Sequence, residues 1–402
     1  MQRVRTGSKQ LIREINQAIV LNVVREQGLA SRSQIAVATG LSPATVSGIA
    51  GQLIANGLLR ERATGKSAGG RRPVLLQLNA SAGYAVGVKV TESAVIAVLT
   101  DLDATIIARQ RLTLDRHDVD DVLDAVEEVS SRLILDAADR PVYGVGVGLA
   151  GIVDSHNGVV HHAPYGDWRE VPLARLLEDR LDLPVIIDND ANTLTATEQW
   201  FGAGRSVSNL LVVCLGHGVG LGMVLDGQLF RGANGGAGEF GHVQVEPSGS
   251  TCACGASGCL ESVISDPAIS SEVSRRIGRR VTIDEAADLA RSGERAALDV
   301  FLEAARILGV ATANLVNILN PDVIVLSGEG TQAGDIIQEE FETSLRLHCF
   351  GSLGDNLRVV IKPWSDEAWA RGAASLLLGE LFEAPTARPK NSRRPALVAR
   401  SM

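Results

Sequence analysis

The first sixty residues alternate apolar and polar positions at helical spacing. A first amphipathic helix over residues 8–27 has its apolar side at Ile12, Ile15, Ile19 and Val23. Ser31 can cap a short second helix that ends near residue 40, and a third helix starts at Pro43 and runs to about residue 56. Two helices joined by a glycine-containing turn predict a helix-turn-helix, although a generic three-helix bundle would produce the same pattern.

The third helix is the one that would enter the major groove of double-stranded operator DNA, leading with its N-terminal residues. Those residues have short side chains that can approach base edges or phosphates closely: Ser42, Pro43, Ala44, Thr45 and Ser47. A β-hairpin follows, with strands near 58–60 and 73–78 and a basic wing between them. Arg71 and Arg72 in this wing are placed to insert into a narrow minor groove.

From about residue 81, runs of β-branched residues alternate with helical patterns, which is typical of an α/β fold with mixed sheets. In the first half we expect strands at 84–90, 94–99, 105–108, 142–148 and 185–187, and helices at 119–136 and 173–181. In the second half we expect strands at 210–215, 223–225, 323–326 and 357–362, and helices at 266–276, 283–292, 296–319, 334–347 and 366–382. Two such units in tandem predict two lobes with a ligand cleft between them.

These patterns divide the chain into a winged helix-turn-helix head at 1–80, a first lobe at 81–195, a second lobe at 196–365 and a disordered tail at 384–402. The helix at 366–383 would return to the first lobe. The head has 11 basic and 3 acidic residues (+8) and the rest has 27 and 44 (−17), which sum to the net charge of −9. A basic head favours contact with a polyanion, although a merely solvated basic surface would have the same charge.

Length and composition narrow the class of protein. A chain of 402 residues with 45% hydrophobic and 21% charged residues can form two or three ordinary globular domains. No apolar run approaches the ~18 residues of a membrane helix, and the start of the chain lacks the apolar core of a signal peptide. We therefore expect no membrane contact and a cytoplasmic location, associated with the nucleoid when the protein is bound to DNA.

Three of the five cysteines lie close together in the sequence, at Cys252, Cys254 and Cys259, and His242 precedes them. Three thiolates and an imidazole are the ligands of a closed, tetrahedral, structural zinc site. The alternative is a set of buried cysteines in a glycine-rich loop. The tight C-x-C-G-x-x-G-C spacing favours zinc, because its glycines permit the chain reversals that a metal knuckle needs.

The chain resembles the ROK family of repressors, open reading frames and sugar kinases from about residue 10 to 382. The family motif G-H-x9-C-x-C-G-x-x-G-C-x-E is matched by Gly241, His242, Cys252, Cys254, Gly255, Gly258, Cys259 and Glu261. Four further segments match: 188–192, 239–242, 148–151 with Ala150 where the family usually has proline, and 42–47. The resemblance implies a two-lobed actin-like, sugar-kinase-like fold of the ribonuclease H type, with structural zinc, behind the DNA-binding head. It also implies a homodimer or a dimer of dimers.

The resemblance further implies a sugar site. The residues that match the family's sugar-binding positions are Asn189, Asp190, Glu239, His242 and Glu261, with Gly151 in the neighbouring matched segment. His242 would also ligate the zinc. In the family's kinases the residue at the position of Asp190 is the general base, whereas here we expect it only to bind. Alternatively, Asp190 is a loop residue that caps a helix starting near Asn192.

Two departures from the family's kinases concern the phosphate loops. The kinases have D-x-G-x-T after the first strand, where this chain has 89–93, KVTES, with Lys89 in place of the aspartate and Glu92 as an added negative charge. The second loop is usually G-T-G, whereas here it is Gly216-His217-Gly218, without the phosphate-binding hydroxyl. We therefore expect no ATP binding, no catalytic residue and no enzyme activity.

The sequence is most consistent with a sugar-responsive transcriptional regulator, a repressor of genes for carbohydrate uptake or catabolism. One alternative is a sugar kinase with an appended DNA-binding head, and a weaker one is a regulator whose partner is another protein. The residues do not identify the sugar. Tyr165 and Asp167 depart from the family's usual pattern in a loop that helps to select it.

Overall fold

The computed structural model describes residues 9–64, 73–164, 166–362 and 366–382. Their contacts group into two compact units. The first unit comprises 1–149, 155–187 and 373–402, and the second comprises 150–154 and 188–372. The wing residues Arg71 and Arg72, Tyr165, and the predicted disordered tail at 384–402 lie outside the described residues.

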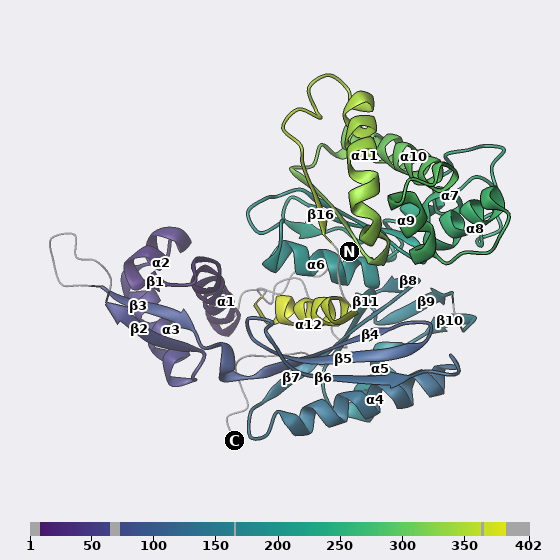
Figure 1. Cartoon of the computed structure of the whole chain (residues 1–402). Helices are drawn as coiled ribbons and strands as arrows, with labels where there is room; N and C mark the ends of the chain where they lie inside the picture. The colour runs from purple at the N-terminus through teal and green to yellow at the C-terminus, as the bar shows by residue number, and fades with distance from the viewer. Residues whose placement is uncertain (1–8, 65–72, 165, 363–365, 383–402) are drawn as a thin grey trace. The chain divides into compact units, whose positions relative to one another are not determined.

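The N-terminal part of the first unit has the predicted helices and hairpin, coloured purple and blue in Figure 1. Its elements are α1 (Lys9–Gln27), β1 (Ala30–Ser31), α2 (Arg32–Thr39), α3 (Pro43–Ala55), β2 (Leu59–Thr64) and β3 (Val74–Leu78). Ser31 caps α2 in a capping box with Gln34, and Ser42 caps α3 with Pro43 in its first turn. Strand β1 escaped prediction because two residues carry no periodic signal, yet it pairs with β3 to give a sheet in the order β1-β3-β2.

The rest of the first unit is built on a sheet in the order β11-β7-β4-β5-β6. Its elements are η1 (Ala80–Ala82), β4 (Tyr84–Val90), β5 (Ala94–Asp101), β6 (Ile106–Thr113), α4 (Val119–Asp136), β7 (Val142–Leu149), β9 (Val159–Ala163), β10 (Trp168–Val171), α5 (Leu173–Leu181) and β11 (Val185–Asn189). Strands β4 and β7 are parallel, whereas β4–β5 and β5–β6 are antiparallel. The predicted α/β class with a mixed sheet is confirmed.

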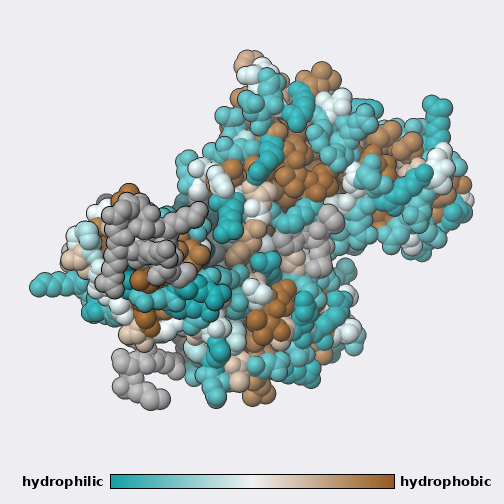
Figure 2. Space-filling view, turned by 60° about the vertical axis from the view of Figure 1, so that its left-hand side comes forward, coloured by the Kyte–Doolittle hydropathy of each residue, from teal (hydrophilic) through white to brown (hydrophobic). Residues whose placement is uncertain are grey.

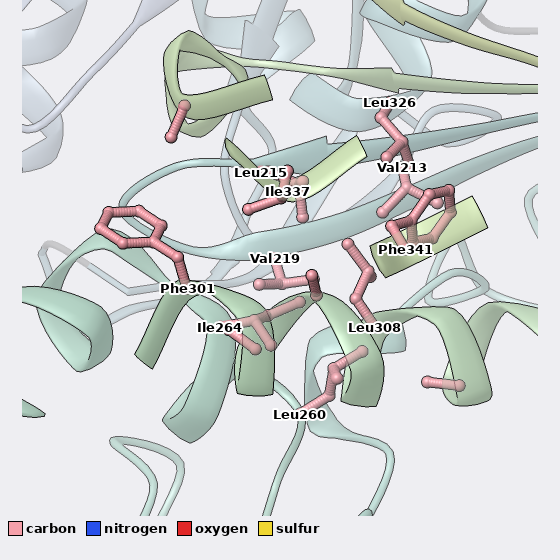
Figure 3. Packing of buried hydrophobic residues seen from close by; sticks show 14 of the residues in the cluster. Val213, Leu215, Val219, Leu260, Ile264, Phe301, Leu308, Leu326, Ile337 and Phe341 are labelled. Atoms are coloured by element: carbon pink, nitrogen blue, oxygen red, sulfur yellow. The ribbon is translucent and has the colours of Figure 1, made fainter. Parts of the chain in front are cut away.

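The second unit has a sheet in the order β14-β13-β12-β15-β16, in which β12, β15 and β16 are parallel. Its strands are β8 (Ile152–Asp154), β12 (Leu210–Leu215), β13 (Val219–Leu225), β14 (Gln228–Leu229), β15 (Val323–Ser327) and β16 (Arg358–Lys362). Its helices are α6 (Asp190–Phe201), η2 (Phe240–His242), α7 (Glu261–Ile264), α8 (Asp266–Ile277), α9 (Ile283–Arg291), α10 (Arg295–Leu319), η3 (Glu329–Ala333) and α11 (Gly334–His348). Apolar side chains of β12 and β15 pack against α10 and α11 in its core (Figure 3).

Strand β13 starts four residues earlier than the expected strand at 223–225, because the glycine-rich stretch before it is extended. A Cβ on Gly222 would lie 1.9 Å from Thr195 Oγ1 and 2.7 Å from Ala191 O. Glycine at 222 therefore lets α6 lie directly on the strand. The sequence-based expectation that these glycines form a loop before residue 223 does not include this contact.

Helix α12 (Asp366–Phe382) belongs to both units, since the second unit ends at Gly372 and the first resumes at Ala373. The sequence predicts a lobe boundary after residue 195, whereas the contacts divide the chain at Asp188 and leave α6 wholly in the second unit. The contacts also group the head with the first lobe, so they do not test the predicted boundary at residue 80.

The surface is mostly polar on the face shown in Figure 2, with apolar patches between the polar regions. Among the described residues, the most exposed large apolar side chains are Val37, Leu135, Ile318, Leu347 and Phe350. Every helix in the described part of the chain is too short or too polar to span a bilayer.

Candidate metal centre and ligand site

The four predicted metal ligands come together. One ligand atom from each of His242, Cys252, Cys254 and Cys259 lies within 4.8 Å of the others, the one such group found in the described residues. His242 Nδ1 is 3.7 Å from Cys252 Sγ, and Cys254 Sγ is 3.7 Å from Cys259 Sγ. Thiolates ~2.3 Å from a tetrahedral zinc would lie about 3.8 Å apart, so these separations fit such an ion. The cluster could therefore hold a metal.

Backbone hydrogen bonds and one glycine, Gly258, shape this knuckle. Cys252 N donates to Ala256 O (2.7 Å), and Gly258 N donates to Ser250 O (2.8 Å). Gly258 has φ +72°, and a Cβ there would lie 1.6 Å from Glu246 O. The knuckle can therefore close only with glycine at 258.

The thiols differ in their surroundings. Burial raises the pKa of Cys259 to about 12 and also raises the pKa of Cys252. A backbone hydrogen bond from Ala256 lowers the pKa of the exposed Cys254 thiol. Because a metal binds thiolates, it must displace protons from the two buried thiols, and its affinity will fall in acid.

Asn189 and Asp190 lie at the start of α6. Asn189 is the N-cap: its side-chain oxygen accepts from Ala191 N (2.8 Å) and its Nδ2 donates to Gly151 O (2.8 Å). The structure thus brings together Asn189 and Gly151, two of the predicted sugar-site residues. The N-cap of α6 is Asn189 and the helix begins at Asp190, two residues before the expected start near Asn192. Asp190 Oδ1 nevertheless accepts from Ala191 N at 2.9 Å, so its carboxylate also bonds to the start of the helix.

Asp188 connects the start of α6 to Arg231, a role that the sequence pattern did not reveal. Its side chain is fully buried, and Oδ2 accepts from Arg231 Nε at 2.7 Å. Its Oδ1 accepts from Asn189 N and from Asn192 Nδ2, each at 2.8 Å. A buried carboxylate with this many donors fixes the start of α6, and with it Asn189 and Asp190.

Glu261 connects the knuckle with strand β13. Its Oε2 accepts from Val219 N (3.0 Å), while Oε1 lies 3.9 Å from Cys252 Sγ. His242 and Glu261 therefore meet around Cys252. The exposed Glu239 directly precedes η2, which ends at His242. Strand β13 also reaches α6, since a Cβ on Gly220 would lie 3.2 Å from Ala191 Cβ.

Two acidic residues that the sequence did not single out lie at the second phosphate loop. A Cβ on Gly216 would be 2.6 Å from Glu329 Oε2, and Asp266 N donates to Gly216 O (2.9 Å). Burial, followed by the charge of Glu329, raises the pKa of Asp266 to about 6. Lys89, from the first phosphate loop, is buried in β4 of the first unit.

The predicted DNA-contacting residues of α3 share one exposed surface. Ser42, Pro43, Ala44, Thr45 and Ser47 are exposed, whereas Val46, Ile49 and Leu53 are buried beneath them. Ser42 Oγ accepts from Thr45 N at 3.1 Å, which fixes the start of the helix. Gln17 of α1 donates to Gln52 Oε1 of α3 (3.0 Å), a tie that the helical periodicity does not reveal.

The model of the ROK family matches residues 85–380. The chain belongs to the ROK family. It is 30% identical over 395 residues to the xylose repressor of Caldicellulosiruptor bescii, covering 94% of this chain and 99% of that one. It is also 30% identical over 388 residues to the DNA-binding transcriptional dual regulator NagC of Escherichia coli, covering 92% of this chain and 94% of NagC.

The crystal structure of a ROK family transcriptional regulator, a homologue of the Escherichia coli Mlc protein, superposes with a TM-score of 0.84 at 28% sequence identity. The match covers 93% of this chain and 98% of that regulator. The two sequence relatives and the crystal structure of the ROK regulator therefore each match the head and the body of this chain together.

Proposed function

We propose that the protein is a sugar-responsive transcriptional regulator that represses genes of carbohydrate uptake or catabolism. The observation that carries the proposal is the match over more than nine-tenths of the chain to ROK regulators, with the head included. The exposed surface of α3 supports the DNA-binding half. The polar residues gathered around α6, β13 and the cysteine knuckle support the sugar-binding half.

In this proposal zinc is structural. His242, Cys252, Cys254 and Cys259 would supply four ligands and leave no position open for a reacting water. Because His242 directs Nδ1 towards Cys252, its Nε2 remains for a sugar hydroxyl. The zinc would thereby fix His242 and Glu261 as sugar-binding groups.

Asn189, Asp190, Glu239, His242 and Glu261, with the Gly151 segment, would bind the hydroxyls of a monosaccharide. A polyol needs several donors and acceptors that converge, and a wrong sugar that leaves one of them buried and unpaired loses ~1–3 kcal/mol. One relative is named a xylose repressor and another an N-acetylglucosamine repressor, so these two sugars are the first to test.

The surroundings of the second phosphate loop support a protein that does not phosphorylate its sugar. A triphosphate at Gly216 would face the acidic side chains of Glu329 and Asp266. It would also lack two of the family kinases' phosphate-loop residues, because His217 stands in place of the threonine and Lys89 in place of the aspartate. Negative side chains repel a polyanion, so we expect neither ATP binding nor kinase activity. The alternative, a sugar kinase with a DNA-binding head, requires phosphate transfer from ATP.

The DNA partner would be a duplex with two half-sites, because helix-turn-helix proteins bind as dimers to sites about one helical turn apart. We therefore propose a homodimer or a dimer of dimers, with Ser42 to Ser47 in the major groove and Arg71 and Arg72 at the minor groove. A protein with this target acts in the cytoplasm, at the nucleoid.

The test is the affinity of the full chain for a duplex recovered by in vitro selection, measured by fluorescence anisotropy with D-xylose, N-acetylglucosamine, glucose or no sugar. We expect one sugar to change the dissociation constant at least about fivefold, within the usual range of allosteric coupling. Binding that no sugar alters would contradict the proposal. A pull-down from cells grown with and without the active sugar separates it from regulation through a protein partner.

A further inference from the structure

Helix α12 contacts two other helices. Its N-terminal end contacts α6, which begins with the proposed sugar-binding residues, and its C-terminal end contacts α1, the first helix of the proposed DNA-binding head. Its first half lies in the second unit and its second half in the first. The two ends of this one helix therefore report on the two proposed binding functions. The contacts at each end are described separately below.

At its N-terminal end α12 is packed tightly on α6. Trp369 is buried in a cluster with Ala191 and Leu194 of α6. A Cβ on Gly372 would lie 2.3 Å from Thr193 O, so the two helix backbones touch with no side chain between them. Arg371 Cζ stacks 4.7 Å from the ring centroid of Phe201, the last residue of α6. A shift of α6 must therefore displace α12, because close-packed backbones have no slack to absorb it.

The C-terminal end of α12 is held by α1. Asn22 Nδ2 donates to Phe382 O (2.9 Å), so a residue 360 positions away in the chain satisfies one of the last carbonyls of the helix. Arg25 Cζ lies 5.2 Å from the ring centroid of Phe382, where its positive charge faces the negative end of the helix dipole. Helix α1 in turn contacts α3 through Gln17 and Gln52.

We infer that α12 transmits sugar binding from α6 to the DNA-binding head through the cap that Asn22 and Arg25 form on Phe382. This inference rests on the proposed function. A sugar bound at Asn189 and Asp190 repositions α6, α12 moves with it, and the change at Phe382 alters how α1 presents α3. Asn22 and Arg25 contact neither ligand in this account, so they are positioning residues.

The test is a linkage measurement on the full chain. The ratio of the dissociation constants for the selected duplex, with and without the sugar active on the wild type, is compared between the wild type and the variant Asn22→Ala/Arg25→Ala. The matched control is Lys9→Ala/Gln10→Ala, which removes one positive charge and one amide from the exposed start of the same helix. We expect the ratio to fall below about threefold in the first variant and to stay at the wild-type value, typically ~5–150-fold, in the control.

A second variant at the other end, Arg371→Met, should lower the same ratio while sugar affinity, measured by calorimetry without DNA, stays within about threefold of the wild type. Hydrogen exchange around residues 22–25 should respond to sugar in the wild type, and in neither Asn22→Ala/Arg25→Ala nor Arg371→Met. A wild-type ratio retained by Asn22→Ala/Arg25→Ala would overturn the relay alone. A wild-type chain whose DNA affinity no sugar alters would overturn the proposed function, and the relay with it.

Discussion

The cysteine knuckle and the second phosphate loop adjoin each other and differ in chemistry. A Cβ on Gly218 would lie 3.1 Å from Glu261 Oε2, the carboxylate that also approaches Cys252. On the knuckle side, three thiolates and one imidazole converge at separations that fit a cation. On the loop side, Glu329 and Asp266 crowd the place where an anion would sit. The comparison predicts that binding groups and phosphate-transfer groups are separable within one α/β unit.

Loss of the metal should have the largest effect. Cys252→Ala removes one of the ligands and should abolish both stoichiometric zinc and the sugar response, because structural zinc contributes ~10–16 kcal/mol to the domains that it organises. Zinc content by atomic emission and sugar binding by calorimetry measure the two losses. Cys349→Ala, a free cysteine outside the cluster, is the control and should change neither. A Cys252→Ala chain with full zinc and full sugar response would refute the bracing role.

Removal of the partner of Asp188 should have the next largest effect. Arg231→Met leaves a fully buried carboxylate without its cation and should cost roughly 3 kcal/mol of unfolding free energy. Chemical denaturation measures the loss. Arg169→Met, which breaks an ion pair between two exposed side chains, should cost less than about 1 kcal/mol. Equal losses in the two variants would show that Asp188 does not anchor the start of α6.

The acidic loop predicts a dependence of stability on pH. The pKa of Asp266 is about 6 in the folded chain against 3.8 for an ordinary aspartate, so the unfolded chain loses this proton first. Stability is therefore lost as pH rises from about 4 to about 6. The asparagine of the variant Asp266→Asn cannot ionise. The variant should therefore be more stable than the wild type by about 1–2 kcal/mol at pH 7.5, a value discounted for the partial exposure of Asp266. At pH 4 the two proteins should be equally stable. A difference that is the same at both pH values would contradict this account.

Glu329→Gln should have the smallest effect. It removes the second negative charge beside Asp266, so the midpoint of the pH effect should move to lower pH, with less than about 1 kcal/mol of change at pH 7.5. Thermal unfolding across a pH series shows the movement. The variant should still not bind ATP, because Lys89 and His217 remain. An unchanged midpoint would mean that Glu329 does not face Asp266 in solution.

The features that the sequence predicts well are those set within a few residues. The caps at Ser31 and Ser42 and the His242, Cys252, Cys254 and Cys259 quartet follow from local spacing. Contacts between distant segments could not be predicted, because residue types alone do not indicate which partners meet. The bond from Arg231 to Asp188, the approach of Glu329 to Gly216 and the cap of Asn22 on Phe382 are of this kind.

The central claim is that the second unit, residues 150–154 and 188–372, binds a sugar, and that the protein neither binds nor uses ATP. Calorimetric titration of the zinc-loaded full chain with D-xylose, N-acetylglucosamine and a non-hydrolysable ATP analogue, followed by a phosphate-transfer assay with ATP, tests it most directly. We predict saturable binding of one of the sugars, no binding of the analogue and no sugar phosphate above background. Saturable binding of the analogue together with turnover would contradict the claim.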